Sequence, residues 1–182
     1  MKVERSELLD YQTYSEKRDE LRRAVAAVKK PRRIHLGEHL TFLFENRDTV
    51  RYQIQEMMRV EQLVKEEAIL HELDTYNGLL GDAGQLGCSL LIEIDEKPVR
   101  DEKLRQWRAL PEHLYMKLAD GSLVRPHYDT QQMDDERLSS VQFLKFDVGK
   151  GAPVALGSDL PALTIEVTLN EEQRQALLLD LN

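Results

Sequence analysis

The side chains with the richest chemistry lie between residues 48 and 76, where apolar residues recur at helical spacing. The polar members of this stretch are Gln53, Gln55, Glu56, Arg59, Glu61, Glu66, Glu67, His71 and Glu72. Glu56 and Arg59 are three positions apart, so they are neighbours on the surface of a helix. That spacing indicates either an Arg–Glu pair that grips an anion in a pocket, or a solvated face held by ion pairs.

Glu61 differs from the other acidic residues because it falls on the apolar stripe that begins at Val50 and Ile54. A carboxylate on such a stripe is buried and needs a partner. Arg59 is only two positions away and points to another side of the helix, so it cannot be that partner. We therefore expect Glu61 to pair with a group on the sheet or on another chain.

Two pairs of residues have the spacing of metal ligands. Glu67 and His71 are four positions apart, but carboxylate-bridged iron sites repeat Glu-x-x-His on two helices, and the chain has no second copy. His35 and His39 should point to opposite faces of a hairpin whose two-residue loop is 37–38. No metal is therefore favoured, and the cofactor stays unknown.

The sequence assigns no reaction. Its single cysteine, Cys88, precedes an apolar run, which favours a small buried residue over a nucleophile. The glycines from Gly78 to Gly87 lack Gly-Lys-Ser/Thr and follow no strand, so they predict a flexible loop rather than a P-loop. No G-x-S-x-G motif occurs.

Composition bounds the class of protein. The 182 residues are 41% hydrophobic, which fits a single domain over residues 1–182. The net charge of −8 argues against nucleic acid as a partner, since phosphate contacts need a positive surface. The amino terminus is charged and no segment approaches the ~20 apolar residues of a membrane span, so we expect a cytoplasmic protein with no membrane contact.

One segment of the chain is basic although the net charge of the protein is negative. Residues 17–33 hold eight basic against two acidic side chains. Its cationic residues, which could contact phosphate, include Arg22, Arg23, Lys29, Lys30, Arg32 and Arg33. The alternative is the end of a helix, where the macrodipole favours cations.

The remaining segments predict an α+β protein: a mostly antiparallel sheet packed by one long helix over 48–76, with N- and C-terminal helices. Thr13 and Glu16 match a capping box within the first helix, 6–29, and Asn170 caps the last one. Asp120-Gly121 is a strong hairpin signal. The expected strands are 32–36, 39–45, 89–95, 113–119, 122–128, 140–148 and 163–168.

A longer pattern joins several of these segments. It comprises Phe42-Leu43-Phe44-Glu45-Asn46-Arg47, Thr49, Tyr52-Gln53-Ile54-Gln55-Glu56-Met57, Arg59 and Glu61, with Lys30–Arg33, Gly37, Glu72–Asp74, Tyr76-Asn77 and 140–146 in the same order. The pattern resembles a bacterial family catalogued as domain-of-unknown-function family 3501. Its genes often lie beside those of rubrerythrin-like and heterodisulfide-reductase-like proteins, which implies a role in redox or peroxide metabolism.

These observations lead to two hypotheses. The first is a binding or accessory module for a redox protein partner that carries the cofactor, through a surface of Tyr52, Gln55, Glu56, Arg59, Glu61 and Asn77. The second is a metal-binding protein or enzyme that uses the carboxylates and His71 of the 48–76 helix. The sequence leaves open whether the chain forms a homo-oligomer.

Overall fold

The computed structural model describes residues 2–129 and 136–181. The helices are α1 (Tyr11–Lys29), α2 (Arg47–Val60), α3 (Glu66–Asn77), α4 (Lys97–Gln106), α5 (Leu110–His113) and α6 (Glu171–Asp180), with the 3-10 turns η1 (Arg5–Glu7) and η2 (Lys30–Arg32). The strands are β1 (Arg33–Leu36), β2 (Leu40–Phe44), β3 (Gln85–Ile92), β4 (Leu114–Lys117), β5 (Leu123–Val124), β6 (Pro126–Tyr128), β7 (Val141–Asp147), β8 (Ala155–Leu160) and β9 (Leu163–Thr168). Within the described ranges, no helix is long and apolar enough to span a bilayer.

Two antiparallel sheets confirm the α+β class. One sheet has the order β1-β2-β3-β7-β6 and the other the order β5-β4-β8-β9. Their inner faces bury one shared core, with Phe42, Leu90 and Phe146 from the first sheet and Met116 and Leu156 from the second. The expectation of a single sheet covered by a long helix is therefore corrected, because the second sheet buries the inner face of the first.

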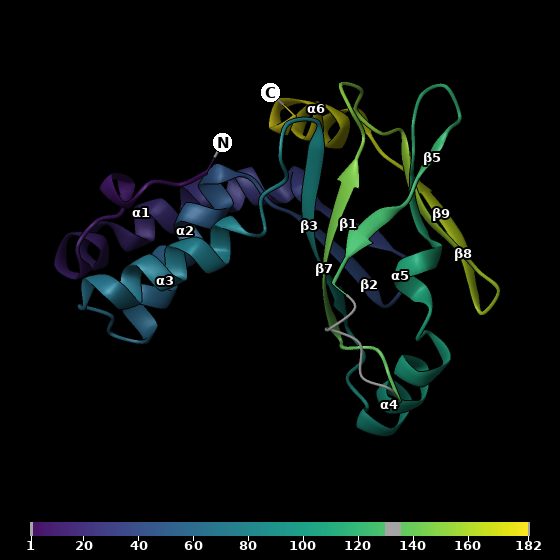
Figure 1. Ribbon diagram of the computed structural model, residues 1–182, viewed down its shortest axis with the longest axis horizontal. Helices are drawn as coiled ribbons and strands as arrows, with labels where there is room; N and C mark the ends of the chain where they lie inside the picture. Colours follow the sequence, from purple (N-terminus) through teal and green to yellow (C-terminus); the bar gives the residue numbers. More distant parts are fainter. Residues whose placement is uncertain (1, 130–135, 182) are drawn as a thin grey trace.

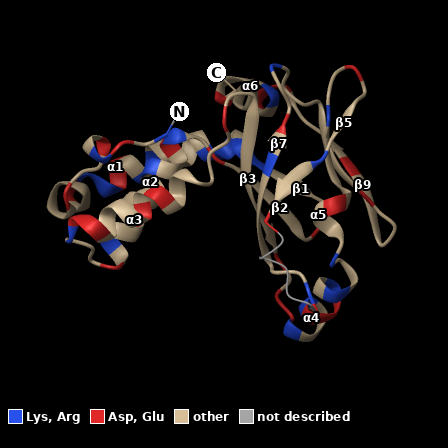
Figure 2. Cartoon of the chain, in the orientation of Figure 1, with Lys and Arg blue, Asp and Glu red and all other residues tan. Residues whose placement is uncertain are grey.

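Helices α1, α2 and α3 lie to one side of the sheets, and we call them the helical arm (Figure 1). The arm has its own apolar core, in which Val50 and Ile54 of α2 meet Ile69 and Leu73 of α3. Charged residues are frequent along the helices, whereas most of the strand ribbon holds none (Figure 2). The arm thus presents a charged exterior while one face of α2 is fully buried. The expectation of a single domain stays a prediction.

The predicted helix over 48–76 is two helices, which corrects the sequence analysis. α2 ends at Val60, and Gln62 adopts a left-handed backbone with φ of 52°. Leu63 N–H then donates to the Met58 carbonyl at 2.9 Å, which turns the chain back toward α3. Glu61 lies at this turn and is exposed, so it does not need the partner that its place on an unbroken stripe required.

Hairpin and cap predictions had mixed outcomes. The turn at Asp120-Gly121 joins β4 to β5 as predicted, and the Asn170 cap of α6 is confirmed. Leu36 pairs with Leu40, so the β1–β2 loop has three residues rather than two. The cap of α1 is Asp10, whose carboxylate accepts from the Thr13 N–H at 3.0 Å, so α1 begins later than the predicted helix.

The junction between the arm and the sheets is built on a buried ion pair. Arg32, at the end of η2, contacts Asp180 of α6 through Nε at 2.7 Å and Nη2 at 2.8 Å. Both side chains are less than a tenth exposed. Asn46, which caps α2, donates to the same carboxylate at 3.2 Å. Arg32 is therefore structural and is not available for the phosphate contacts that the basic segment suggested.

We expect Arg32→Leu to destabilise the fold by about 3–5 kcal/mol, because it leaves the Asp180 carboxylate buried without its cation. The matched control is Arg33→Leu, since Arg33 is the next residue and is exposed. The control should change stability by no more than about 0.5 kcal/mol. Urea unfolding followed by circular dichroism measures both, and equal losses in the two variants would contradict the assignment.

Candidate functional site

Glu56, the centre of the predicted site, joins two helices of the arm. Its carboxylate accepts from the Tyr14 hydroxyl at 2.6 Å and from two Arg18 nitrogens at 2.8 Å, and Arg59 lies at 3.4 Å. The hydrogen bonds from Arg18 lower the pKa of Glu56 to about 2. Its oxygens are thus occupied by α1 and α2 themselves. The predicted Arg59–Glu56 pair exists, but it sits in a contact between helices.

Gln55 and Asn77 hold the amino-terminal segment. The Gln55 amide accepts from Leu9 N–H at 2.6 Å and donates to the Leu9 carbonyl at 3.2 Å. The Asn77 amide makes the same two bonds to Val3, at 2.8 and 2.9 Å. Each amide therefore satisfies both polar backbone groups of one residue, so these buried side chains fix the path of the chain across the arm.

The other predicted residues do not converge on one place. Tyr52 is half-buried, with the Lys29 ammonium 5.3 Å from its ring centroid. Glu67 and His71 are exposed on α3, as Glu61 is at the end of α2. In the part of the chain that the structure describes, no three His, Cys, Asp or Glu side chains are grouped to hold a metal ion.

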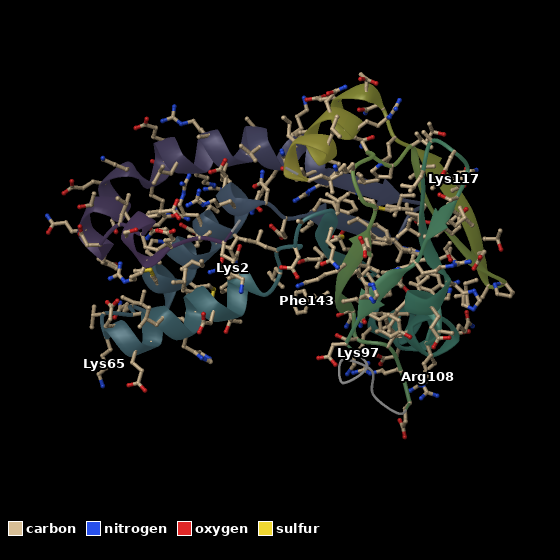
Figure 3. All side chains as sticks on the ribbon, turned by 45° about the horizontal axis from the view of Figure 1, so that its top comes forward. Lys2, Lys65, Lys97, Arg108, Lys117 and Phe143 are labelled. Carbon is tan, nitrogen blue, oxygen red and sulfur yellow. The ribbon has the colours of Figure 1, made fainter. Side chains whose placement is uncertain are left out.

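The described residues instead form a cleft of about 800 Å³ between the helical arm and the outer face of the five-stranded sheet. Most of its lining is apolar. Its lining includes Leu43, Leu91, Val141 and Phe143 on the sheet and Val50, Gln53 and Tyr76 on the arm. Figure 3 shows Phe143 on the side of β7 that faces the arm.

Strand alternation explains why this face carries these residues. On β2, Leu40, Phe42 and Phe44 point into the shared core. Because strand side chains alternate, Thr41, Leu43 and Glu45 lie on the opposite face of the sheet, which faces the arm. Antiparallel register then sets rows across the sheet: Leu43 lies beside Ser89, and Ser89 beside Phe143. The adjacent row is Thr41, Leu91 and Val141. The strand register therefore determines which side chains form the floor of the cleft.

Two acidic residues, Glu45 and Asp129, are among the described residues that line the cleft, and Glu45 lies at its inner end, directly after β2. Its carboxylate accepts from the Thr49 hydroxyl at 2.5 Å, and its N–H donates to the Gly87 carbonyl at 2.9 Å. Burial raises the pKa of Glu45, against the opposing effects of Thr49, the Lys29 charge and the Ser89 hydroxyl. A fixed, half-buried carboxyl in an apolar cleft is the kind of group that marks functional sites.

Gly87 is the β3 residue whose carbonyl accepts from the Glu45 N–H. A Cβ at this position would lie 1.9 Å from the Leu79 carbonyl oxygen, so the connection between α3 and β3 crosses directly over the glycine. The sequence analysis assigned 78–87 to a flexible loop, but β3 already begins at Gln85. The glycine is needed for close approach of two backbones, not for flexibility.

Cys88 and the histidines agree with their sequence interpretations. Cys88 is buried, and burial raises the pKa of its thiol well above the ordinary value, which suits a core residue. His35 contacts the Thr41 hydroxyl at 3.0 Å, whereas the ring of His39 lies 6.1 Å from that of Trp107. The two histidines are thus separate structural residues.

Glu45 belongs to the family pattern in the sequence but is not one of the residues that were predicted to form the site. One local signal was present: a carboxylate that follows a strand and directly precedes the Asn46 cap of α2. The other lining residues include members of α1, α3, β3, β6 and β7, which only the fold brings to Glu45. Two of the predicted residues neighbour a lining residue: Tyr52 contacts Lys29 through its ring, and Asn77 follows Tyr76 in the chain.

Comparisons with known proteins agree with this fold. A family model described as "Protein of unknown function (DUF3501)" matches residues 2–181. The crystal structure of a "novel protein of unknown function" from Burkholderia pseudomallei K96243 is similar over the whole of both chains, with 30% sequence identity and a TM-score of 0.91. No curated protein matches. Neither description states a ligand or a reaction.

We expect Gly87→Ala to destabilise the protein by about 1–3 kcal/mol, because the new methyl group must displace the Leu79 backbone. Gly151→Ala is the matched control, since a Cβ there meets nothing within 4 Å. Its stability should stay within about 0.5 kcal/mol of the parent protein. Thermal unfolding of both variants tests this, and an unaffected Gly87→Ala protein would show that the connection does not press on β3.

We expect Glu45→Gln to gain stability relative to the parent protein as the pH rises from about 4 to about 8. Because the pKa of Glu45 is raised in the folded state, its stabilising contribution is present below the unfolded pKa and is lost as the pH rises through the folded value. An amide escapes this loss. Glu38→Gln, in the exposed β1–β2 loop, should show no such trend in urea unfolding, and a Glu45→Gln difference that shrinks with pH would contradict the assignment.

Proposed function

This chain belongs to the family of proteins of unknown function described as DUF3501, and we propose that it is a binding module that takes a small, mostly apolar molecule into the cleft between the helical arm and the sheet. The observation that carries the proposal is the cleft itself. Its volume of about 800 Å³ and its mostly apolar lining surface, with polar side chains such as Glu45 and Gln53 among the lining residues, are typical of small-molecule sites.

The lining suggests how such a molecule would be held. Leu43, Leu91 and Val141 offer an apolar floor, whose burial stabilises a complex by about 25 cal/mol per Å² removed from water. Glu45 at the inner end and Gln53 on α2 supply hydrogen-bonding groups that orient the ligand. Affinity would thus come from the floor and orientation from the inner end.

The accessory role in redox or peroxide metabolism remains part of this proposal, together with a cytoplasmic location. A binding module without a cofactor of its own can serve a partner that carries one. The surface first proposed for that partner loses support, because Glu56 is engaged by Arg18, and Gln55 and Asn77 by the amino-terminal segment. The metal alternative gains nothing from the geometry, since Glu67 and His71 are exposed and no described side chain joins them in a group of three.

Nile red, an uncharged dye that fluoresces in apolar surroundings, tests the cleft. We expect one saturable site per chain, and we expect Val141→Trp to weaken it at least about tenfold because the indole occupies the floor. Val64→Trp is the control: the same substitution at a residue 79% exposed in the turn between α2 and α3, away from the cleft. No saturable binding, or equal binding by both variants, would overturn the proposal.

A further inference from the structure

The carboxylate of Glu45 differs from those of Glu56 and Asp180, which are also shielded from solvent. Glu56 has the Arg18 guanidinium at 2.8 Å, and Asp180 has that of Arg32 at 2.7 Å. No Lys, Arg or His nitrogen of the described ranges lies within the 4.0 Å ion-pair distance of Glu45. Its hydrogen-bond donors are the hydroxyls of Thr49 and Ser89, so its charge is not neutralised by contact with a cation.

Lys29 and Lys145 also line the cleft. The Lys29 ammonium lies 5.3 Å from the centroid of the Tyr52 ring, where the ring face attracts it. Lys145 starts on β7, with β3 between it and Glu45, so the two backbones are about 10 Å apart. Neither lysine forms an ion pair with Glu45, which leaves room for the cation of a ligand.

Other features of the cleft also favour a positive group. Tyr76 and Phe143 line it, and aromatic rings attract cations through their faces. The net charge of −8 adds a field that draws cations toward the molecule. A half-buried carboxylate without a cation gains most from a ligand that supplies one.

We propose that the cleft recognises a primary amine carried on an apolar chain or ring, with the ammonium bound to Glu45 and the apolar part lying on Leu91, Val141 and Phe143. This inference rests on the proposed binding function and adds the chemistry of the ligand. The amine could belong to a free small molecule or to a lysine side chain of a partner protein, since both present the same group.

The test is titration calorimetry near pH 8 with 1-octylamine, 1-octanol and octanoate, which share a chain and differ in the end group. An alkyl ammonium stays protonated at that pH, as lysine does. We expect octylamine to bind at least about tenfold more tightly than octanol, and octanoate to bind most weakly. In Glu45→Gln, octylamine should fall to the affinity of octanol. In the exposed control Glu38→Gln, the preference should be unchanged.

The outcomes separate the two proposals. If octanol binds and octylamine binds no better, or octanoate binds more tightly, the amine inference is wrong and the binding function stands. If none of the three binds and Nile red does not either, both fail. The comparison among ligands needs only the parent protein, so it holds even if Glu45→Gln folds poorly. Nα-acetyl-lysine methylamide adds one arm: binding as tight as octylamine supports a partner's lysine as the source, and much weaker binding supports a free amine.

Discussion

The buried ion pair between Arg32 and Asp180 fixes the place where the helical arm meets the sheets. It joins the start of β1 to the carboxyl-terminal helix, and through the Asn46 amide it also holds the first turn of α2. Removing two charges from water is costly, and the pair persists because additional hydrogen bonds, such as that to the Ala176 carbonyl, satisfy the guanidinium. Since α2 starts at this point, the width and direction of the cleft depend on it.

Features with a local cause could be predicted from the sequence, and features set by strain or distant contacts could not. Asp120-Gly121 and the Asn170 cap were predicted because the residues that form them are adjacent along the chain. The break after Val60 was missed, because it depends on a positive φ at Gln62, a residue type that rarely adopts one. The helical spacing continues through this turn in the sequence although the helix does not.

The candidate site was missed for a related reason. Polar residues were dense between 48 and 76, and the fold uses many of them inside the arm: Glu56 joins α1 to α2, and Gln55 binds the backbone of Leu9. Glu45 stood alone in the sequence, and its surroundings became visible only when β3 and β7 were placed beside β2. The dense polar residues of the helices therefore serve contacts within the protein, whereas the single carboxylate at the end of β2 lies in the cleft.

The two hydrogen bonds between Asn77 and the Val3 backbone also bear on the deamidation of Asn77. Asn77 is followed by Gly78, and Asn-Gly is the dipeptide in which the side-chain amide cyclises most readily onto the next backbone nitrogen. Here the amide is held by Val3, and the Gly78 N–H is bonded to the Asp74 carbonyl at 3.1 Å, so the folded last turn of α3 opposes that cyclisation. Deamidation would replace the donor facing the Val3 carbonyl with a carboxylate. The lifetime of the amino-terminal attachment is thus set by how often this turn opens.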